Sequence, residues 1–426
     1  MTELLNSPPV GSRALMQQLN AVRVIHELRQ RGPLSCAALS RAIGLSKPTV
    51  YALVDLLEQL QYITSTSKHR AQEGPGRPSR LYAFRPDFGY VLGADIGADK
   101  IIVMISDLDG TVLSKVRFDH GSSASSKHLD ALGTFRRACG QALEQAGIDA
   151  KRLMSVVVGI PGVLAADGTL SNIPQIPEWE GFAIKRELES QFSCPVTVER
   201  EVNLLVRAEK QLGLARDLSN ALLIQLGVGV GAGLLMDGKV FQGANGAAGE
   251  IGSMPIGTPD GEQDAFGQFE WASGGAGIAA RGSRAAKEPG GEALLAAANG
   301  DPGSIDAALV FATARDGDKA SARIVNSAVD TLATGIAVLI CAFNPEAVIL
   351  SGGMTMSQDL ILGPLTTSLK DSLPFTPHIA VSELTDSAVP LGAIHYGLDV
   401  AAVRLTHIPE LTHFSDNDGA EKDATN

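Results

Sequence analysis

One plan of strands and turns occurs twice in this chain, about 130 residues apart. In the first copy, from Tyr90, the apolar runs YVLGADI and IIVMISD flank a glycine-containing turn, and a second turn ending at Gly110 leads into TVLSKVRF. The second copy has ALLIQLG, a glycine-rich turn over residues 227–233, GLLM, a tight turn at Asp237 and Gly238, and KVFQGA. Apolar runs bounded by glycine and aspartate predict strands joined by turns. The repeat therefore predicts a duplicated α/β body whose two lobes face each other across a cleft.

The turn after the first strand of each copy contains glycine, at Gly97 and at Gly227 and Gly229. Backbone N–H groups without side chains can approach a phosphate closely. A single glycine turn also serves an ordinary hairpin, but two in equivalent positions favour a phosphate site between the lobes. The first turn, however, carries Asp99, whose negative charge repels an approaching anion.

The first 85 residues have a different pattern. Apolar residues between Leu15 and Leu28 follow one helical face, and a second short helix fits residues 35–43. Ser46 is a good N-cap for a third helix, with Pro48 in its first turn and apolar residues at i, i+3, i+4 and i+7 from Val50. Two short helices joined by a tight turn predict a helix-turn-helix whose second helix enters a DNA major groove.

The polar face of this third helix carries Lys47, Thr49 and Tyr51. Lys47 and the helix N-terminus, capped by Ser46, suit phosphates, whereas Thr49 and Tyr51 can touch base edges. The strand ends around a polar tip in residues 62–84 predict a wing whose basic residues include Arg77 and Arg80, and the run GPGRP can lay Arg77 into a minor groove.

Charge agrees with a DNA-binding head. Residues 1–85 contain eleven Lys and Arg against five Asp and Glu, a net charge of +6, whereas the whole chain carries −12. A basic head on an acidic body is typical of a protein whose head meets a polyanion. The alternative is a three-helix module that binds a protein instead of DNA. The wing and the capped helix favour double-stranded DNA.

The body resembles the ROK family, which groups bacterial sugar kinases with sugar-responsive repressors. The resemblance rests on LGADIGADKI, VVGIPGVL, SNIPQIPEW, VEREVNLLVRAE, GANGAAGEIG and NPEAVILSGGM, spread over residues 88–395. It implies an actin-like ATPase (ribonuclease H-like) fold of two lobes. The head followed by GRP and GYVLGADIG resembles the repressor branch, since the kinase relatives lack such a head.

The resemblance also implies where phosphate would bind in a kinase. The family kinases carry DIGGTK in the first loop; here Asp95 and Gly97 are kept, but Ala98 and Asp99 replace a glycine and a threonine. A carboxylate beside a triphosphate repels it and removes a hydrogen bond. In the second loop, Gly227 and Gly229 flank Val228, which replaces another threonine. ATP is therefore not expected as a cofactor, although Lys100 could pair with Asp99 and soften the repulsion.

The acceptor side departs from the kinase pattern as well. Where the family has Asn-Asp, this chain has Arg200 and Glu201, so Glu201 occupies the position of the catalytic base with a longer side chain that moves the carboxylate by more than ~1 Å. Two roles are open for Arg200: selecting an anionic effector, such as a sugar phosphate or sugar acid, or forming a salt bridge with Glu201 or Glu250. No catalytic residue is therefore expected, although Glu201 stands at the position of the base.

Other sugar contacts of the family have counterparts here. The resemblance places Glu250, Glu270 and Asn172 among the groups that bind ring hydroxyls. The positions of the family's structural zinc ligands are Ser253, Gly261, Gln263 and Gln268, which cannot hold tetrahedral zinc. No metal is therefore expected.

Together, these features predict three parts: a winged helix-turn-helix domain at 1–85, a ROK sugar-kinase-like effector and dimerisation domain at 86–405, and an acidic disordered tail at 406–426. The predicted function is a cytoplasmic transcriptional regulator of carbohydrate use, a repressor that forms a homodimer or higher homo-oligomer. It binds operator DNA and a sugar, sugar phosphate or sugar acid. No apolar run is long enough to predict a membrane span. The alternatives are an ATP-dependent sugar kinase with a fused DNA-binding head, and a body that senses a protein partner.

Overall fold

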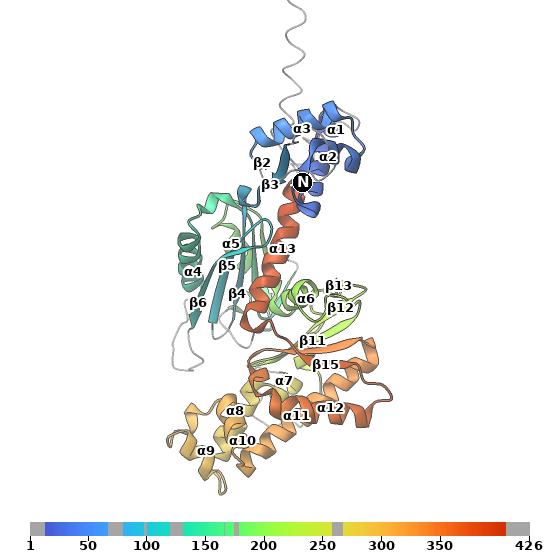
Figure 1. Ribbon diagram of the computed structural model, residues 1–426. Helices are drawn as coiled ribbons and strands as arrows, with labels where there is room; N and C mark the ends of the chain where they lie inside the picture. The colour runs from blue at the N-terminus through green and yellow to red at the C-terminus, as the bar shows by residue number, and fades with distance from the viewer. Residues whose placement is uncertain are drawn as a thin grey trace, which may run out of the picture.

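The computed structural model describes residues 13–66, 80–97, 100–119, 131–165, 167–173, 179–257 and 267–405. A small N-terminal domain lies at one end, and two α/β lobes follow it (Figure 1). We call the part built on the sheet of residues 90–200 lobe 1 and the part built on the sheet of residues 221–381 lobe 2. The long helix α13 (Ala388–Leu405) runs from the lobe junction, past lobe 1, to the N-terminal domain.

The N-terminal domain is a winged helix-turn-helix. Its elements are α1 (Arg13–Arg31), β1 (Leu34–Ser35), α2 (Cys36–Ile43), α3 (Lys47–Gln59), β2 (Ile63–Thr66) and β3 (Leu81–Phe84). Gly44 ends α2 in the left-handed conformation, and the Ser46 side chain accepts the backbone N–H of Thr49, as predicted for the cap of α3. The two-residue strand β1 was not predicted; it completes a sheet of order β1-β3-β2.

Lobe 1 is a five-stranded sheet with the order β10-β7-β4-β5-β6. Its strands are β4 (Tyr90–Ile96), β5 (Lys100–Asp107), β6 (Val112–Asp119), β7 (Leu153–Ile160) and β10 (Val196–Arg200). β4, β5 and β6 form an antiparallel meander, and β7 and β10 run parallel to β4. One face of the sheet packs on helices α4 (Ala131–Ala146) and α5 (Ile184–Glu189).

Lobe 2 repeats this topology with the order β13-β12-β11-β14-β15. Its strands are β11 (Ala221–Leu226), β12 (Val230–Met236), β13 (Lys239–Val240), β14 (Ala347–Ser351) and β15 (His378–Val381). Again three strands form an antiparallel meander and the last two run parallel to the first. The duplication predicted from the sequence is confirmed.

Helices make up the rest of lobe 2. They are α7 (Gln268–Ser273), α8 (Gly275–Ala285), α9 (Glu292–Ala297), α10 (Ala307–Arg315), α11 (Lys319–Phe343) and α12 (Gln358–Ser372). Among the described residues, α11 is the helix that is long and apolar enough to span a membrane by length and composition. Val325, Leu332 and Ile336 of α11 belong to the buried core of lobe 2, which accounts for its apolar character.

The glycine-rich stretch 227–233 is not all turn, and this part of the prediction is wrong. The turn is limited to residues 227–229, and β12 begins at Val230. Gly233 lies within the strand, where a Cβ would come within 2.6 Å of the Val202 carbonyl oxygen of helix α6 (Glu201–Leu212). Close helix-to-strand packing, and not a phosphate, therefore requires this glycine. The predicted strand KVFQGA is also shorter than expected, since β13 contains two residues.

Two helices join the lobes, and they pack against each other. α6 leads from lobe 1 into lobe 2, and α13 returns from lobe 2 to the sheet of lobe 1. A Cβ at Gly392 of α13 would lie 1.9 Å from the Leu204 carbonyl oxygen of α6, so the two backbones are in direct contact. The C-terminal part of α13 shares an apolar core with the N-terminal domain, to which Ala401 and Leu405 contribute.

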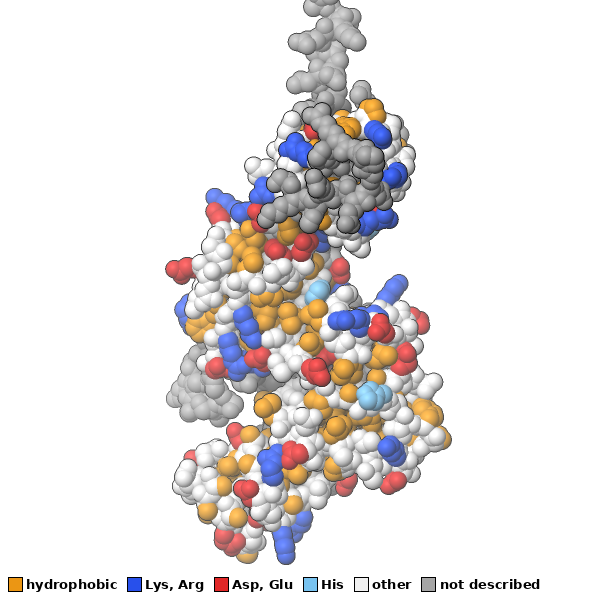
Figure 2. Space-filling view, viewed as in Figure 1, with side chains coloured by type: hydrophobic (Ala, Val, Ile, Leu, Met, Phe, Trp, Pro, Cys, Tyr) orange, Lys and Arg blue, Asp and Glu red, His pale blue; other side chains and the backbone are white. Residues whose placement is uncertain are grey.

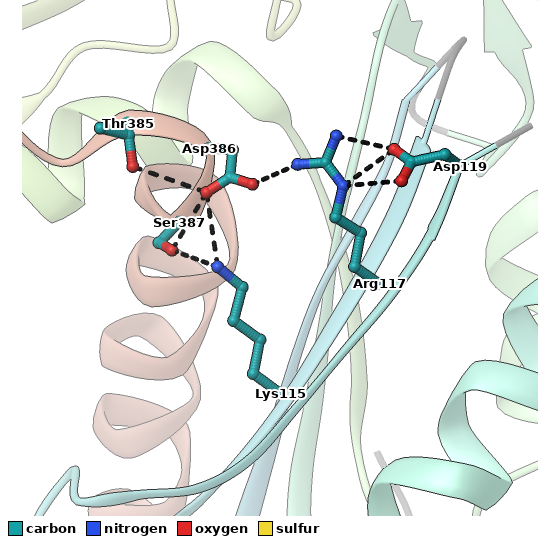
Figure 3. Close-up of polar contacts among 6 residues, drawn as sticks. All are labelled: Lys115, Arg117, Asp119, Thr385, Asp386 and Ser387. Carbon is teal, nitrogen blue, oxygen red and sulfur yellow. Dashed lines mark hydrogen bonds and ion pairs between the residues drawn. The ribbon is translucent and has the colours of Figure 1, made fainter. Parts of the chain in front are cut away.

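A polar network fixes the point where the chain crosses back to lobe 1 (Figure 3). Asp386, in the short 3-10 helix (Thr385–Ser387) that leads into α13, pairs with Lys115 and Arg117 of the edge strand β6. Lys115 also donates to Ser387 Oγ at 2.7 Å, and Arg117 pairs with Asp119 at 2.7 Å. The network holds the start of α13 against the edge of lobe 1.

Candidate functional site

The exposed face of α3 is the surface predicted to meet DNA. Lys47, Thr49 and Tyr51 are all exposed, whereas Val50, Leu53, Val54 and Leu57 are buried. Asp55, which the sequence analysis did not single out, is exposed four residues after Tyr51 on the same helical face. Its i+4 spacing from Tyr51 was the available signal, and a carboxylate there can accept a hydrogen bond from a cytosine amino group.

Arg80 immediately precedes β3, the second strand of the wing, and its side chain contacts neighbouring groups. Its guanidinium pairs with Glu58 at 3.1 Å, donates to Ser65 Oγ at 2.6 Å and lies over the ring of Tyr82. Arg80 therefore fixes the wing to α3, while more than half of its side chain stays exposed for a phosphate. Arg77 lies outside the described residues. On the face drawn in Figure 2, Lys and Arg side chains flank the N-terminal domain.

The residues at the carboxyl ends of the lobe 1 strands form one half of the second site. Asp95 of β4 and Glu199 of β10 are both in register with Gly159 of β7, which lies between them. Asp95 and Glu199 are buried, at 5% and 9% exposure, and Arg200 ends β10 at 4% exposure. In open α/β sheets, ligands bind at the carboxyl ends of the strands.

The two glycine turns follow β4 and β11, the first strand of each lobe. The Gly97 N–H donates to the Lys100 carbonyl at 2.9 Å, which closes the first turn, but Ala98 and Asp99 lie outside the described residues. In the second turn the Gly227 N–H donates to the Gly229 carbonyl at 3.0 Å, and Val228 is exposed. The carbonyls of Gly227 and Val228 accept the first N–H groups of α8, from Gly275 and Ala276. These two N–H groups at the start of α8 are thus already hydrogen-bonded within the protein.

Arg200 bridges the lobes. Its Nη2 pairs with Glu250 Oε1 of lobe 2, and its Nη1 donates to the carbonyls of Ala248 at 2.5 Å and Gly246 at 3.4 Å. The other oxygen of Glu250 accepts from Asn172 Nδ2 at 2.7 Å. Of the two roles open for Arg200, the structure shows the salt bridge, with Glu250. Selection of an anionic effector stays a prediction.

A second contact between the lobes was missed by the sequence analysis. Glu199 Oε2 accepts from Gln242 of lobe 2, while Glu199 Oε1 accepts from the Arg200 N–H and from Asn203 Nδ2, each at 2.9 Å. Glu199 therefore holds the end of β10 and the start of α6 in place. Its position next to Arg200 in VEREVN was the available signal. We call Asn172, Glu199, Arg200, Glu201, Glu250 and Glu270 the interlobe site.

Glu270 and Glu201 complete the interlobe site. Glu270 lies on α7, and its Oε1 accepts the Val230 N–H at 3.2 Å. Burial raises the pKa of Glu270 to about 7, and the negative charges of Glu250 and Glu201 act in the same direction. A Cβ built on Gly252, two residues after Glu250, would lie 3.3 Å from Glu270 Oε2, so Glu270 and the loop of Glu250 are neighbours within lobe 2. Glu201 is the first residue of α6, where the helix dipole favours a carboxylate.

The raised pKa of Glu270 predicts a dependence of stability on pH. Between about pH 4.5 and pH 7 the carboxyl ionises in the unfolded chain but stays protonated in the folded protein, so stability falls as the pH rises through this range. The loss should be on the order of 2–3 kcal/mol, and Glu270→Gln should remove it. Thermal denaturation of both proteins at pH 5 and pH 8 measures the difference. Parallel pH profiles for the two proteins would contradict the prediction.

The family's zinc positions do not fit a metal where they are described. Ser253 lies in a short 3-10 helix, and the Gln268 amide donates to the Gly257 carbonyl. Neither side chain is a thiolate or an imidazole, which structural zinc requires. Gly261 and Gln263 lie outside the described residues. Within the described ranges, no group of three or more His, Cys, Asp or Glu residues could hold a metal ion.

The N-terminal domain and the two-lobed body each match the sequence model of a known family. The sequence model of the ROK family matches residues 91–398, and that of the IclR helix-turn-helix domain matches residues 20–67. The xylose repressor of Caldicellulosiruptor bescii is 24% identical over 392 residues, which cover 90% of this chain and 96% of that protein. The glucokinase of Thermotoga maritima is 28% identical over 310 residues, which cover 71% of this chain and 95% of that enzyme.

Solved structures show the same difference in coverage. A ROK family transcriptional regulator, a homologue of the Escherichia coli MLC protein, superposes with a TM-score of 0.68 at 24% identity and covers 92% of this chain and 99% of its own. A ROK family glucokinase from Streptomyces griseus, in complex with glucose and AMPPNP, gives a TM-score of 0.60 at 24% identity and covers 72% of this chain and 99% of its own. Both share the fold of the two-lobed body.

Proposed function

We propose, from the premise that this chain belongs to the ROK family, that it is a DNA-binding transcriptional regulator, a repressor of carbohydrate-utilisation genes controlled by a sugar or sugar derivative. The observation that carries the proposal is the winged helix-turn-helix joined to the family's two-lobed body. The relative named a xylose repressor aligns with 90% of this chain, whereas the relative named a glucokinase aligns with 71%.

In this proposal, α3 lies in the major groove of operator DNA. Lys47 and the N-terminus of α3 contact phosphates, and Thr49 and Tyr51 contact base edges. The wing, with Arg77 and Arg80, lies along the neighbouring minor groove. Two heads of a homodimer bind the two half-sites of an operator, since operator symmetry mirrors the symmetry of the protein. The protein acts in the cytoplasm.

The interlobe site binds the effector. Ring hydroxyls can form hydrogen bonds with Glu250, Glu270 and Asn172. When a ligand forms these bonds, the lobes can change their relative position. An effector that binds one lobe arrangement more tightly shifts the protein towards that arrangement. The shift changes the spacing of the two heads and lowers operator affinity. In this proposal neither ATP nor a structural zinc takes part.

The second candidate is an ATP-dependent sugar kinase with a fused DNA-binding head. It is favoured by Asp95 at the carboxyl end of β4 and Glu201 at the position of the base, and by the 28% identity to a glucokinase. The replacements at Asp99, Val228 and Arg200 disfavour it, as does the use of the Gly275 and Ala276 N–H groups by the second turn.

Footprinting tests the proposal. The full chain should protect a site in DNA upstream of its own gene or a neighbouring gene, and one member of a panel of pentoses, hexoses and their acids or phosphates should release it. The affinity for this site should exceed that for unrelated DNA by at least about a thousandfold at physiological salt.

Two results would contradict the proposal. If the protein protected every DNA sequence equally and added salt alone abolished the protection, it would bind DNA only through non-specific charge. Release of ADP from ATP and a panel sugar, abolished by Glu201→Gln, would favour the kinase instead.

A further inference from the structure

The sugar-binding face of the interlobe site is occupied by the protein itself. Glu250, the carboxylate expected to accept hydrogen bonds from a sugar, has one oxygen paired with Arg200 and the other bonded to Asn172. Both partners come from lobe 1, and Glu250 belongs to lobe 2. The Arg200 guanidinium also donates hydrogen bonds to two backbone carbonyls of the same lobe 2 loop, those of Ala248 and Gly246.

The burial of Arg200 makes this bridge difficult to open. The Arg200 side chain is 5% exposed, whereas that of Glu250 is 28% exposed. A buried guanidinium that loses its carboxylate keeps an uncompensated charge, which is strongly unfavourable. A ligand that takes Glu250 away from Arg200 must therefore overcome this cost.

The charge of the interlobe site decides which ligands can separate Glu250 from Arg200. The interlobe site contains four carboxyl groups, of Glu199, Glu201, Glu250 and Glu270, and one guanidinium. Burial raises the pKa of Glu270, and the charges of Glu250 and Glu201 act in the same direction, so further negative charge is unfavourable here. Carboxylates are acceptors without donors, which suits the hydroxyl groups of a neutral sugar.

We propose that Arg200 is an internal competitor of the effector. It clamps the lobes together through Glu250 in the free protein, and a neutral, polyhydroxylated ligand opens the clamp by donating hydroxyl groups to Glu250 and Asn172. This inference rests on the proposed sugar-binding function of the interlobe site. Arg200 thereby sets the effector concentration at which the protein responds.

The main test compares sugar binding by the full chain with and without the competitor. Calorimetric titration with D-glucose, D-xylose, D-gluconate and D-glucose 6-phosphate is performed on the natural protein and on Arg200→Gln. We expect Arg200→Gln to bind a neutral sugar at least tenfold more tightly and the anions no better. Arg200→Lys, which keeps the charge but not the forked geometry, should fall between the two. Arg136→Gln, which removes an exposed arginine paired with Glu187 in lobe 1, is the control and should bind as the natural protein does.

Two binding results would overturn the inference. Equal affinity of the natural protein and Arg200→Gln for a neutral sugar would show that no competition exists. Tight binding of gluconate or glucose 6-phosphate, lost in Arg200→Gln, would show that Arg200 is a ligand of an anionic effector instead.

A second measurement separates this inference from the proposed function. Thermal denaturation of Arg200→Gln, Glu250→Gln and the double variant needs no ligand. A double variant that loses clearly less stability than the two single variants combined supports the clamp, and additive losses overturn it. If the stabilities are coupled but no sugar binds to any variant, the clamp stands as a structural contact, the competitor role is overturned, and the proposed sugar-binding function fails with it.

Discussion

Tyr51→Asp is expected to lower operator affinity at least about a hundredfold while leaving the stability of the protein unchanged. Tyr51 is 53% exposed near the start of α3, whereas Val50 and Val54 are buried. A carboxylate at this point meets the phosphates and base edges of the major groove, where a like charge costs several kcal/mol. Gel-shift titration on the footprinted site, alongside thermal denaturation, measures both quantities.

Gln59→Asp is the matched control for this substitution. Gln59 is the last residue of α3, is also exposed, and accepts the same new charge in the same helix. Because it lies two turns further from the N-terminal end that enters the groove, affinity should fall less than about tenfold, by the long-range effect of one charge alone. An equal loss for both variants would mean that net charge, and not the face of α3, governs DNA binding.

Gly249→Ala is expected to abolish effector binding and to destabilise lobe 2 by about 2–4 kcal/mol. Gly249 precedes Glu250 and has a φ of +89°, and a Cβ there would lie 1.9 Å from the Ala232 carbonyl oxygen of β12. The Gly249 carbonyl also accepts the Ala232 N–H at 3.0 Å, so the loop cannot move away without losing a strand contact. Glu250 would be displaced from Arg200 and Asn172. Calorimetric titration with the identified effector and thermal denaturation measure the two losses.

Gly246→Ala separates backbone strain from steric exclusion. Gly246 has a similar φ of +71°, but the nearest group to a Cβ there is the Leu164 carbonyl oxygen at 3.8 Å. This variant should lose about 1 kcal/mol from the left-handed conformation and keep its effector affinity within a few-fold. If it lost as much binding as Gly249→Ala, the cause would be the flexibility of the loop and not the contact with β12.

Much of the fold followed from local patterns. Ser46 capped α3 as predicted because a serine before a helix offers the missing acceptor to the N–H groups of the first turn. The duplicated lobes were predictable because each strand pair carries its own turn residues, such as Asp237 and Gly238, both of which adopt positive φ. These signals depend on a few consecutive residues and need no knowledge of the rest of the chain.

The glycines within strands misled the sequence analysis. Gly233 had the same local appearance as the turn glycines, yet it lies in β12 beneath α6. The strand β1 was missed because its two residues carry no alternation that could be recognised. Whether a glycine serves a turn or a close contact depends on which helix packs over it, and that helix can be far away in the sequence.

The sequence by itself identified five of the six residues of the interlobe site, all except Glu199. The residues Asn172, Arg200, Glu201, Glu250 and Glu270 were identified from the family motifs, and the structure brings Asn172 and Arg200 into direct contact with Glu250. It left two roles open for Arg200, selection of an anionic effector or a salt bridge with Glu201 or Glu250.

Only the tertiary structure decided which partner Arg200 has. Glu201 is adjacent in sequence and Glu250 is 50 residues away, but the end of β10 directs Arg200 across the lobe junction to Glu250. Ion pairing depends on distance and direction in space, and these are set by how the two sheets face each other. Glu270 is likewise perturbed by its surroundings in the fold: burial, with the charges of Glu250 and Glu201, raises its pKa, which no local motif could indicate.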